Sequence, residues 1–144
     1  MIRWRTGDRV GIDVMAVYQI ADAVNRFGDR YLNRVYTAAE LADCAVQPSA
    51  MAASLAARFA AKEAVRKVLR SSGGLPWTGI EIRRAQWGGC EINLGAHAAR
   101  LADEQGITAL SVSMSHEDGV AVAIVLAQRE ALFEEGAVRG ADDS

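Results

Sequence analysis

The chain has 144 residues, of which 51% are hydrophobic and 24% charged, and its formal net charge is −2. This length most simply gives a single domain over residues 1–144, with a core at about 8–127 and a polar C-terminal tail at 128–144. This slightly negative net charge argues against a nucleic-acid partner. There is no apolar run of about 18 residues, no signal-peptide core, and no CxxC spacing of the two cysteines. We therefore expect a cytoplasmic protein with free thiols and no membrane segment.

Residues 10–17 predict a buried strand, because the segment is apolar and rich in β-branched residues apart from one acid, Asp13. A carboxylate inside such a strand is costly to remove from water unless a partner or a metal compensates it. Asp13 could therefore be a structural residue that caps a turn, or it could belong to a ligand site.

Residues 18–36 are expected to be helical with a break near Gly28, because glycine readily ends a helix. Arg26, Arg30 and Arg34 follow one another at four-residue intervals across this break. They fit either a solvated face or a patch that contacts an acidic protein.

Two more helices are predicted before the middle of the chain. Thr37 and Glu40 have the spacing of a capping box, which indicates a short helix to about residue 44, and the Ala-rich sequence from residue 50 indicates a long one to about residue 69. The long helix carries one acid, Glu63, among the cations Arg58, Lys62, Arg66 and Lys67. Like charges four residues apart repel by about 0.2–0.5 kcal/mol per pair. This pattern favours an anionic partner, although charges that simply reach solvent would also produce it.

The second half of the chain alternates apolar and polar residues, as half-buried strands do. It predicts a hairpin at 80–85 and 90–94, a helix at 95–106, and a second hairpin at 109–115 and 120–126. The predicted fold class is α+β, with an antiparallel sheet packed on the long central helix.

Asp13, Glu63 and the Ser115-His116 pair are the candidates for chemistry. Two carboxylates from separate elements suit Mg2+ held jointly with a phosphate ester, because Mg2+ is usually bound by one or two carboxylates plus substrate phosphates. Nearby cations would neutralise the remaining phosphate oxygens. The sequence has no P-loop, GxGxxG, GxSxG or HExxH pattern, so a phosphate site would be of another type.

Three segments together resemble the holo-[acyl-carrier-protein] synthase family, the short-chain branch of the 4′-phosphopantetheinyl transferases. They are Gly11-Ile12-Asp13, Arg58-Phe59-Ala60-Ala61-Lys62-Glu63-Ala64-Val65-Arg66-Lys67, and Ser113-Met114-Ser115-His116. Their order and spacing match over about residues 8–127, and the central segment is highly specific.

The resemblance implies Mg2+-dependent transfer of the 4′-phosphopantetheine arm from coenzyme A to a serine of an acyl carrier protein, with release of adenosine 3′,5′-bisphosphate. It implies Asp13 and Glu63 as metal ligands, and a catalytic set of Glu63, Lys62 and Lys67. The expected coenzyme A contacts are Arg58, Lys62, Lys67, Ser115 and His116, and the expected carrier-protein contacts are Arg26, Arg30 and Arg34. Family members form homotrimers with active sites at subunit interfaces, so a homotrimer is expected here.

The chain departs from the family pattern at three places. Ala16 and Gln19 stand where an acid and an arginine are common, and the turn at residues 88–90 lacks the usual basic residue and proline. These differences fit an enzyme adapted to a dedicated carrier of polyketide or fatty-acid biosynthesis. They also fit an alternative, a catalytically weak module that binds coenzyme A or a carrier protein.

Overall fold

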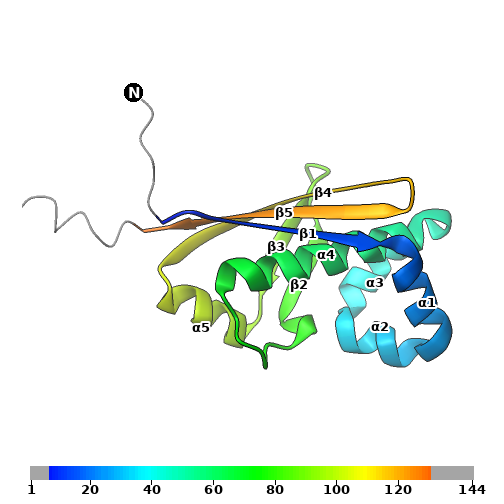
Figure 1. Ribbon diagram of the computed structural model, residues 1–144, viewed down its shortest axis with the longest axis horizontal. Coiled ribbons are helices and arrows are strands. Elements are labelled where there is room, and N and C mark those ends of the chain that lie inside the picture. Colours follow the sequence, from blue (N-terminus) through cyan, green and yellow to red (C-terminus); the bar gives the residue numbers. More distant parts are fainter. Residues whose placement is uncertain (1–6, 131–144) are drawn as a thin grey trace, which may run out of the picture.

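The computed structural model describes residues 7–130, so most of the predicted C-terminal tail lies outside the described residues. Its helices and strands follow the predicted α+β order (Figure 1): β1 (Arg9–Ala16), α1 (Val17–Phe27), α2 (Asp29–Val35), α3 (Ala38–Ala45), α4 (Met51–Leu69), β2 (Ile80–Arg84), β3 (Cys90–Leu94), α5 (Ala96–Glu104), β4 (Ile107–Glu117) and β5 (Val120–Arg129). Short 3-10 helices at Pro48–Ala50 and Trp77–Gly79 lead into α4 and β2.

The helix boundaries follow local sequence signals. Gly28 has a φ of 53° and separates α1 from α2, which explains the predicted break. Thr37 and Glu40 form the predicted capping box, in which each side chain accepts a hydrogen bond from the other residue's backbone N–H. Between residues 7 and 130, no helix is both long enough and apolar enough to cross a membrane.

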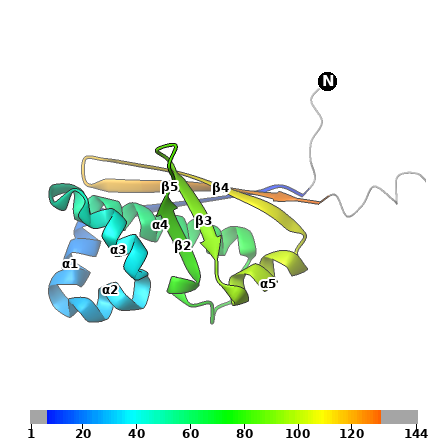
Figure 2. The ribbon, with the colours of Figure 1, turned by 180° about the vertical axis from the view of Figure 1, so that it is seen from behind.

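β1, β5 and β4 form a three-stranded antiparallel sheet in that order, and β2 and β3 form a separate hairpin. Figures 1 and 2 show that the helices lie on one side of the larger sheet, where α4 runs beneath β1 and β5. The small residues Ala121, Ala123 and Ala127 on β5 are fully buried against this side, together with Val125. They allow α4 to approach the sheet closely.

The opposite face of the three-stranded sheet is apolar and exposed. Alternate residues of β1 and β5 point to this side, and their exposed fractions run from 37% to 69%: Val10, Ile12, Val14, Val120, Ile124 and Leu126. In the described part of the chain no helix covers this surface, which we call the outer sheet face (Figure 2). Contiguous exposed apolar surface of this kind usually marks an interaction site.

Gly11 allows β1 to lie directly on α4. A Cβ atom at Gly11 would be 2.3 Å from the Ala64 carbonyl oxygen and 3.1 Å from Val68 Cγ1. Because the nearest atom belongs to the helix backbone, no side-chain rotation could make room. Glycine is thus required two residues before Asp13.

Gly11→Ala is expected to reduce the free energy of unfolding by about 1–3 kcal/mol, since overpacking at a rigid contact forces the strand and the helix apart. Urea denaturation would measure the change. Gly7→Ala is the matched control, because a Cβ there would meet only Arg129 Cβ at an ordinary 3.7 Å. Equal stability of the two variants would show that the contact between β1 and α4 yields easily.

Candidate active site

Asp13 and Lys67 meet between β1 and α4. Asp13 lies on the same face of β1 as Gly11, because alternate residues of a strand share a face. The Lys67 ammonium donates to Asp13 Oδ1 at 3.2 Å and to the Ile12 carbonyl oxygen at 2.7 Å. The side chain of Asp13 is 20% exposed and that of Lys67 is 53% exposed. Asp13 is therefore a strand residue with a cationic partner, and the pair remains accessible from solvent.

Glu63 lies one helical turn before Lys67 and is half-buried. At about 100° per residue, the two side chains leave α4 in directions that differ by only about 40°. Among the described residues, Glu63 has neither a hydrogen-bond partner nor an ion-pair partner. A carboxylate that is half-removed from water without compensation is well suited to bind a cation.

The donor set fits Mg2+ better than a metal that needs a full protein cage. Within residues 7–130 there is no group of three or more side chains that could hold a metal ion. Asp13 and Glu63 instead offer carboxylate oxygens from two elements, and a phosphate ligand would have to complete the coordination. This is the usual arrangement for Mg2+ in proteins.

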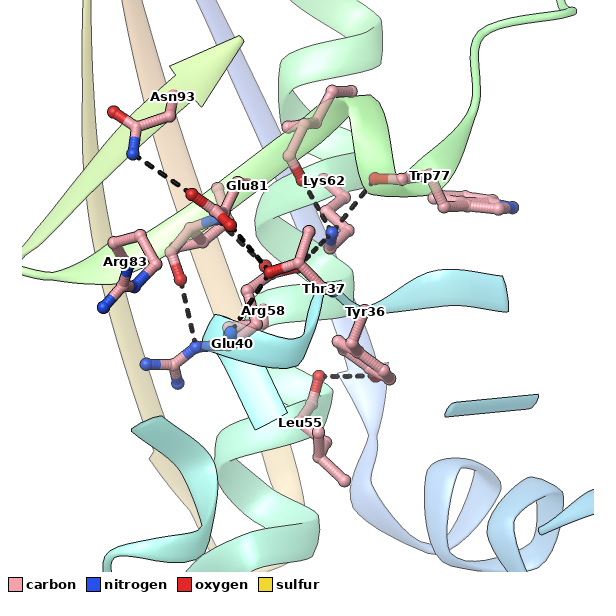
Figure 3. A network of polar contacts seen from close by, with 12 residues as sticks. Tyr36, Thr37, Glu40, Leu55, Arg58, Lys62, Trp77, Glu81, Arg83 and Asn93 are labelled. Atoms are coloured by element: carbon pink, nitrogen blue, oxygen red, sulfur yellow. Dashed lines mark hydrogen bonds and ion pairs between the residues drawn. The ribbon is translucent and has the colours of Figure 1, made fainter. Parts of the chain in front are cut away.

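Lys62 is buried in the interior, where its ammonium lies between Glu40 and Trp77 (Figure 3). Its ammonium donates to Glu40 Oε1 at 2.7 Å, to the Ile80 carbonyl oxygen at 2.6 Å and to the Trp77 carbonyl oxygen at 3.0 Å. The side chains of Lys62 and Glu40 are both 0% exposed. Burial lowers the pKa of Lys62, while the Glu40 carboxylate opposes this shift.

The three donors of the Lys62 ammonium are thus all used by protein oxygens. The expected contact between Lys62 and a phosphate stays a prediction, and it would require the ammonium to give up one of these three acceptors. Its place beside Glu63 on α4 makes it a structural anchor of the helix that carries the candidate metal ligand.

Arg58 also differs from its expected position. The residue is only 3% exposed, and it donates to the Ile82 and Ser54 carbonyl oxygens at 3.3 and 3.4 Å. Its Nη2 atom is buried without a hydrogen-bond partner in the described part of the chain, and the expected contact with coenzyme A stays a prediction. Of the four cations of α4, only Arg66 and Lys67 are therefore accessible to solvent.

Glu40 is the polar residue that sequence reasoning missed. In addition to the hydrogen bond from the Lys62 ammonium, the Glu40 carboxylate accepts hydrogen bonds from the backbone N–H groups of Thr37 and Ile82, at 3.0 and 2.9 Å. The capping box placed Glu40 at the start of α3 but gave no sign that this end of the helix would be buried. Figure 3 shows that Glu40 joins α3, α4 and β2 at one point.

Ser115 and His116 are exposed near the end of β4, which lies two strands away from the strand of Asp13 within one chain. Asp13 pairs with Ala123 on β5, and Ala123 pairs with Met114 on β4. Two strand spacings, about 9–10 Å, therefore separate the backbones of β1 and β4. The chain does not bring Ser115 and His116 together with Asp13.

Arg26, Arg30 and Arg34 are all exposed, on two different helices. Arg26 lies in the last turn of α1 and forms an exposed ion pair with Asp22, with 3.0 Å between Nε and Oδ2. Arg30 and Arg34 lie one turn apart on α2, and neither has an ion-pair partner in the described part of the chain. These two side chains leave positive charge free at the surface.

Comparison with known proteins assigns this arrangement to a class. The family model described as "4'-phosphopantetheinyl transferase superfamily" matches residues 9–125. This range contains Asp13, Glu63, Lys67 and His116, so the match covers every element of the candidate site. The chain is thus a transferase of this superfamily.

Curated relatives narrow the class. A holo-[acyl-carrier-protein] synthase from Chloroflexus aggregans is 44% identical over 129 residues, which cover 81% of this chain and 92% of the relative. One from Desulforudis audaxviator is 42% identical, covering 82% of this chain and 90% of the relative.

Solved structures agree with these relatives. The holo-[acyl-carrier-protein] synthase from Helicobacter pylori, solved in complex with coenzyme A, is 30% identical with a TM-score of 0.73, covering 83% of this chain and 100% of that one. The Neisseria meningitidis synthase is 31% identical with a TM-score of 0.73, covering 83% of this chain and 97% of that one. The chain belongs to the holo-[acyl-carrier-protein] synthase family.

Proposed function

We propose that this enzyme transfers 4′-phosphopantetheine from coenzyme A to a serine of an acyl carrier protein. The observation that carries the proposal is Glu63, which has no partner among residues 7–130 and lies beside the Asp13–Lys67 pair in a chain of this family. In the reaction, the serine oxygen forms a bond to the phosphorus that bears pantetheine. The bond from that phosphorus to the bridging oxygen breaks, and adenosine 3′,5′-bisphosphate leaves with that oxygen and its electron pair. The serine hydroxyl releases its proton to solvent.

Asp13 and Glu63 would hold Mg2+ in this proposal, and the metal would supply positive charge for the diphosphate oxygens. Lys67, which forms an ion pair with Asp13 in this structure, would also place its ammonium against the same phosphates. Phosphoryl transfer depends mainly on positioning and charge stabilisation. Lys62 and Glu40 would contribute by fixing α4, which presents Glu63 and Lys67.

Mass spectrometry of an apo carrier protein incubated with this enzyme, coenzyme A and Mg2+ tests the proposal. We expect the carrier to gain the mass of phosphopantetheine, and chelation of the metal to prevent the gain. A panel of fatty-acid and polyketide carriers would identify the preferred substrate. No gain with any carrier would overturn the proposal.

A module that binds coenzyme A or a carrier without turnover is the second candidate, because Ala16 and Gln19 replace an acid and an arginine at the start of α1. Gln19 is exposed there and is uncharged, so it adds nothing to the positive charge of Arg26, Arg30 and Arg34. The same assay, run beside a direct measurement of carrier binding, separates the two functions. A carrier that is bound but never modified would favour the binding module.

We further propose that the enzyme is a homotrimer with active sites between subunits. The outer sheet face offers an apolar surface for association, and within one chain His116 lies across the sheet from Asp13. A neighbouring copy could bring its own Ser115 and His116 to the Asp13 side, where they would contact coenzyme A. Association would thus complete a site that one chain leaves divided.

Val14→Asp is expected to shift the oligomer toward monomers, because it places a charge on the outer sheet face at a residue that is 59% exposed. Size-exclusion chromatography with light scattering would give the mass. Val46→Asp is the matched control, since Val46 is 67% exposed at the end of α3, away from the sheet. An unchanged trimer with Val14→Asp would exclude this face as the interface.

A further inference from the structure

An open pocket lies between the C-terminal end of α2 and the outer side of α4. Its volume is about 390 Å³, and its walls are formed by Arg34, Arg66 and the segment Gly74-Leu75-Pro76-Trp77. Arg34 and Arg66 have no ion-pair partner within residues 7–130. The pocket therefore has two uncompensated positive charges above an apolar wall.

Arg66 is held in place more firmly than an ordinary surface arginine. Its guanidinium stacks on Trp77, with 3.7 Å from Cζ to the ring centroid, and it donates through Nη2 to the Leu75 carbonyl oxygen. Trp77 in turn stacks on Phe59, with 4.9 Å between the ring centroids. The Nε atom of Arg66 is buried without a hydrogen-bond partner, and Nη1 makes no hydrogen bond within residues 7–130. The cation is oriented in advance, but its hydrogen-bonding capacity is not filled.

The pocket lies beside Glu63 on the side away from Asp13. At about 100° per residue, Arg66 leaves α4 about 60° to one side of Glu63, and Lys67 about 40° to the other. Lys67 contacts Asp13 on β1, whereas Arg66 faces Trp77 and the pocket. Glu63 thus separates two cationic regions on the exposed side of α4.

We infer that the pocket between Arg34 and Arg66 binds a carboxylate side chain of the acyl carrier protein. The inference rests on the proposed transfer reaction and adds to it how the carrier is held. Two substrates must meet at the phosphate near Glu63. Coenzyme A would occupy the Asp13 and Lys67 side, which leaves the Arg66 side for the protein whose serine attacks.

The chemistry of the pocket fits a carboxylate from an acidic protein surface. The two oxygens of a carboxylate can accept from Arg66 Nη1 and from the Arg34 guanidinium, because both arginines line the pocket. Arg34 follows Arg30 by one turn on α2, so the pocket continues the exposed arginines of that helix. A partner that lies on this helix can thus place one acidic side chain in the pocket.

Steady-state kinetics with each substrate varied in turn tests the inference. For Arg66→Gln, we expect the KM for the carrier to rise about tenfold, while kcat and the KM for coenzyme A stay near the wild-type values. Arg66→Lys keeps the charge but loses the planar guanidinium, so its KM for the carrier should lie between those of the wild type and Arg66→Gln. Arg100→Gln, an exposed cation on α5, is the matched control and should leave all three parameters unchanged.

Direct binding separates this inference from the proposed reaction. The probe is a fatty-acid acyl carrier protein whose acceptor serine is replaced by alanine, so that no transfer is needed. We expect Arg66→Gln and Arg34→Gln each to weaken binding of the carrier. The double variant should weaken it by less than the product of the two single fold-changes, because both arginines hold the same carboxylate. Wild-type affinity in Arg66→Gln would overturn the inference and leave the transfer reaction standing. A rise in the KM for coenzyme A alone would instead assign the pocket to a phosphate.

Discussion

Lys62→Met is expected to lower the free energy of unfolding by about 3–5 kcal/mol, because it removes one partner of a buried ion pair and leaves the other charged. The Glu40 carboxylate would lose its bond from the Lys62 ammonium, now 2.7 Å long, at a point where both side chains are 0% exposed. The Ile80 and Trp77 carbonyl oxygens would lose the same donor. Urea denaturation followed by circular dichroism would measure the loss.

Two further variants identify the cause. Lys67→Met removes an exposed cation from the same helix and is expected to cost no more than about 1 kcal/mol. The double variant Lys62→Met with Glu40→Leu removes both buried charges and should recover much of the lost stability. A loss of less than 1 kcal/mol in Lys62→Met alone would mean that water or local rearrangement compensates Glu40 easily.

Local sequence signals predicted the order of helices and strands because each acts over a few residues. Gly28 ends α1 through its positive φ, and Thr37 and Glu40 cap α3 within a single turn. The alternation in the second half of the chain gave both hairpins, although β4 and β5 extend beyond the predicted ends to Ile107–Glu117 and Val120–Arg129. Their extra residues are added by pairing between strands, which no local pattern encodes.

The charges of α4 could not be assigned from the sequence, because their roles depend on elements far along the chain. Arg58, Lys62 and Arg66 look equivalent at four-residue spacing. β2 covers the first two, however, and supplies the Ile82 and Ile80 carbonyl oxygens that bind them. Only Arg66 stays at the edge, where the ring of Trp77 supports it.

The pairing of Asp13 with Lys67 was also beyond the sequence patterns, since 54 residues separate them. The resemblance to a family pointed to both residues and to Glu63, but not to which cation would face which acid. The three-dimensional arrangement places Asp13 and Glu63 on the open side of α4, and Lys62 on the closed side. Of the two predicted catalytic lysines, Lys67 is thus the one that lies exposed beside Asp13.

Glu63→Gln is expected to reduce the rate of phosphopantetheine transfer by at least about 10²-fold, because the amide cannot replace the negative charge that would hold Mg2+. The fold should persist, since among the described residues Glu63 makes no hydrogen bond or ion pair that the change would break. Thermal denaturation would check the fold, and the carrier mass assay with varied Mg2+ would check the activity. We expect the residual activity to require a higher Mg2+ concentration.

Glu104→Gln is the matched control for this prediction, because it removes an exposed carboxylate at the end of α5, away from β1 and α4. It should leave both the rate and the Mg2+ requirement unchanged. A stable Glu63→Gln enzyme with full activity would exclude Glu63 as a metal ligand. The metal would then depend on Asp13 and on groups from a neighbouring subunit. A variant whose rate falls while its Mg2+ requirement stays constant would instead make Glu63 a residue that acts on the serine hydroxyl.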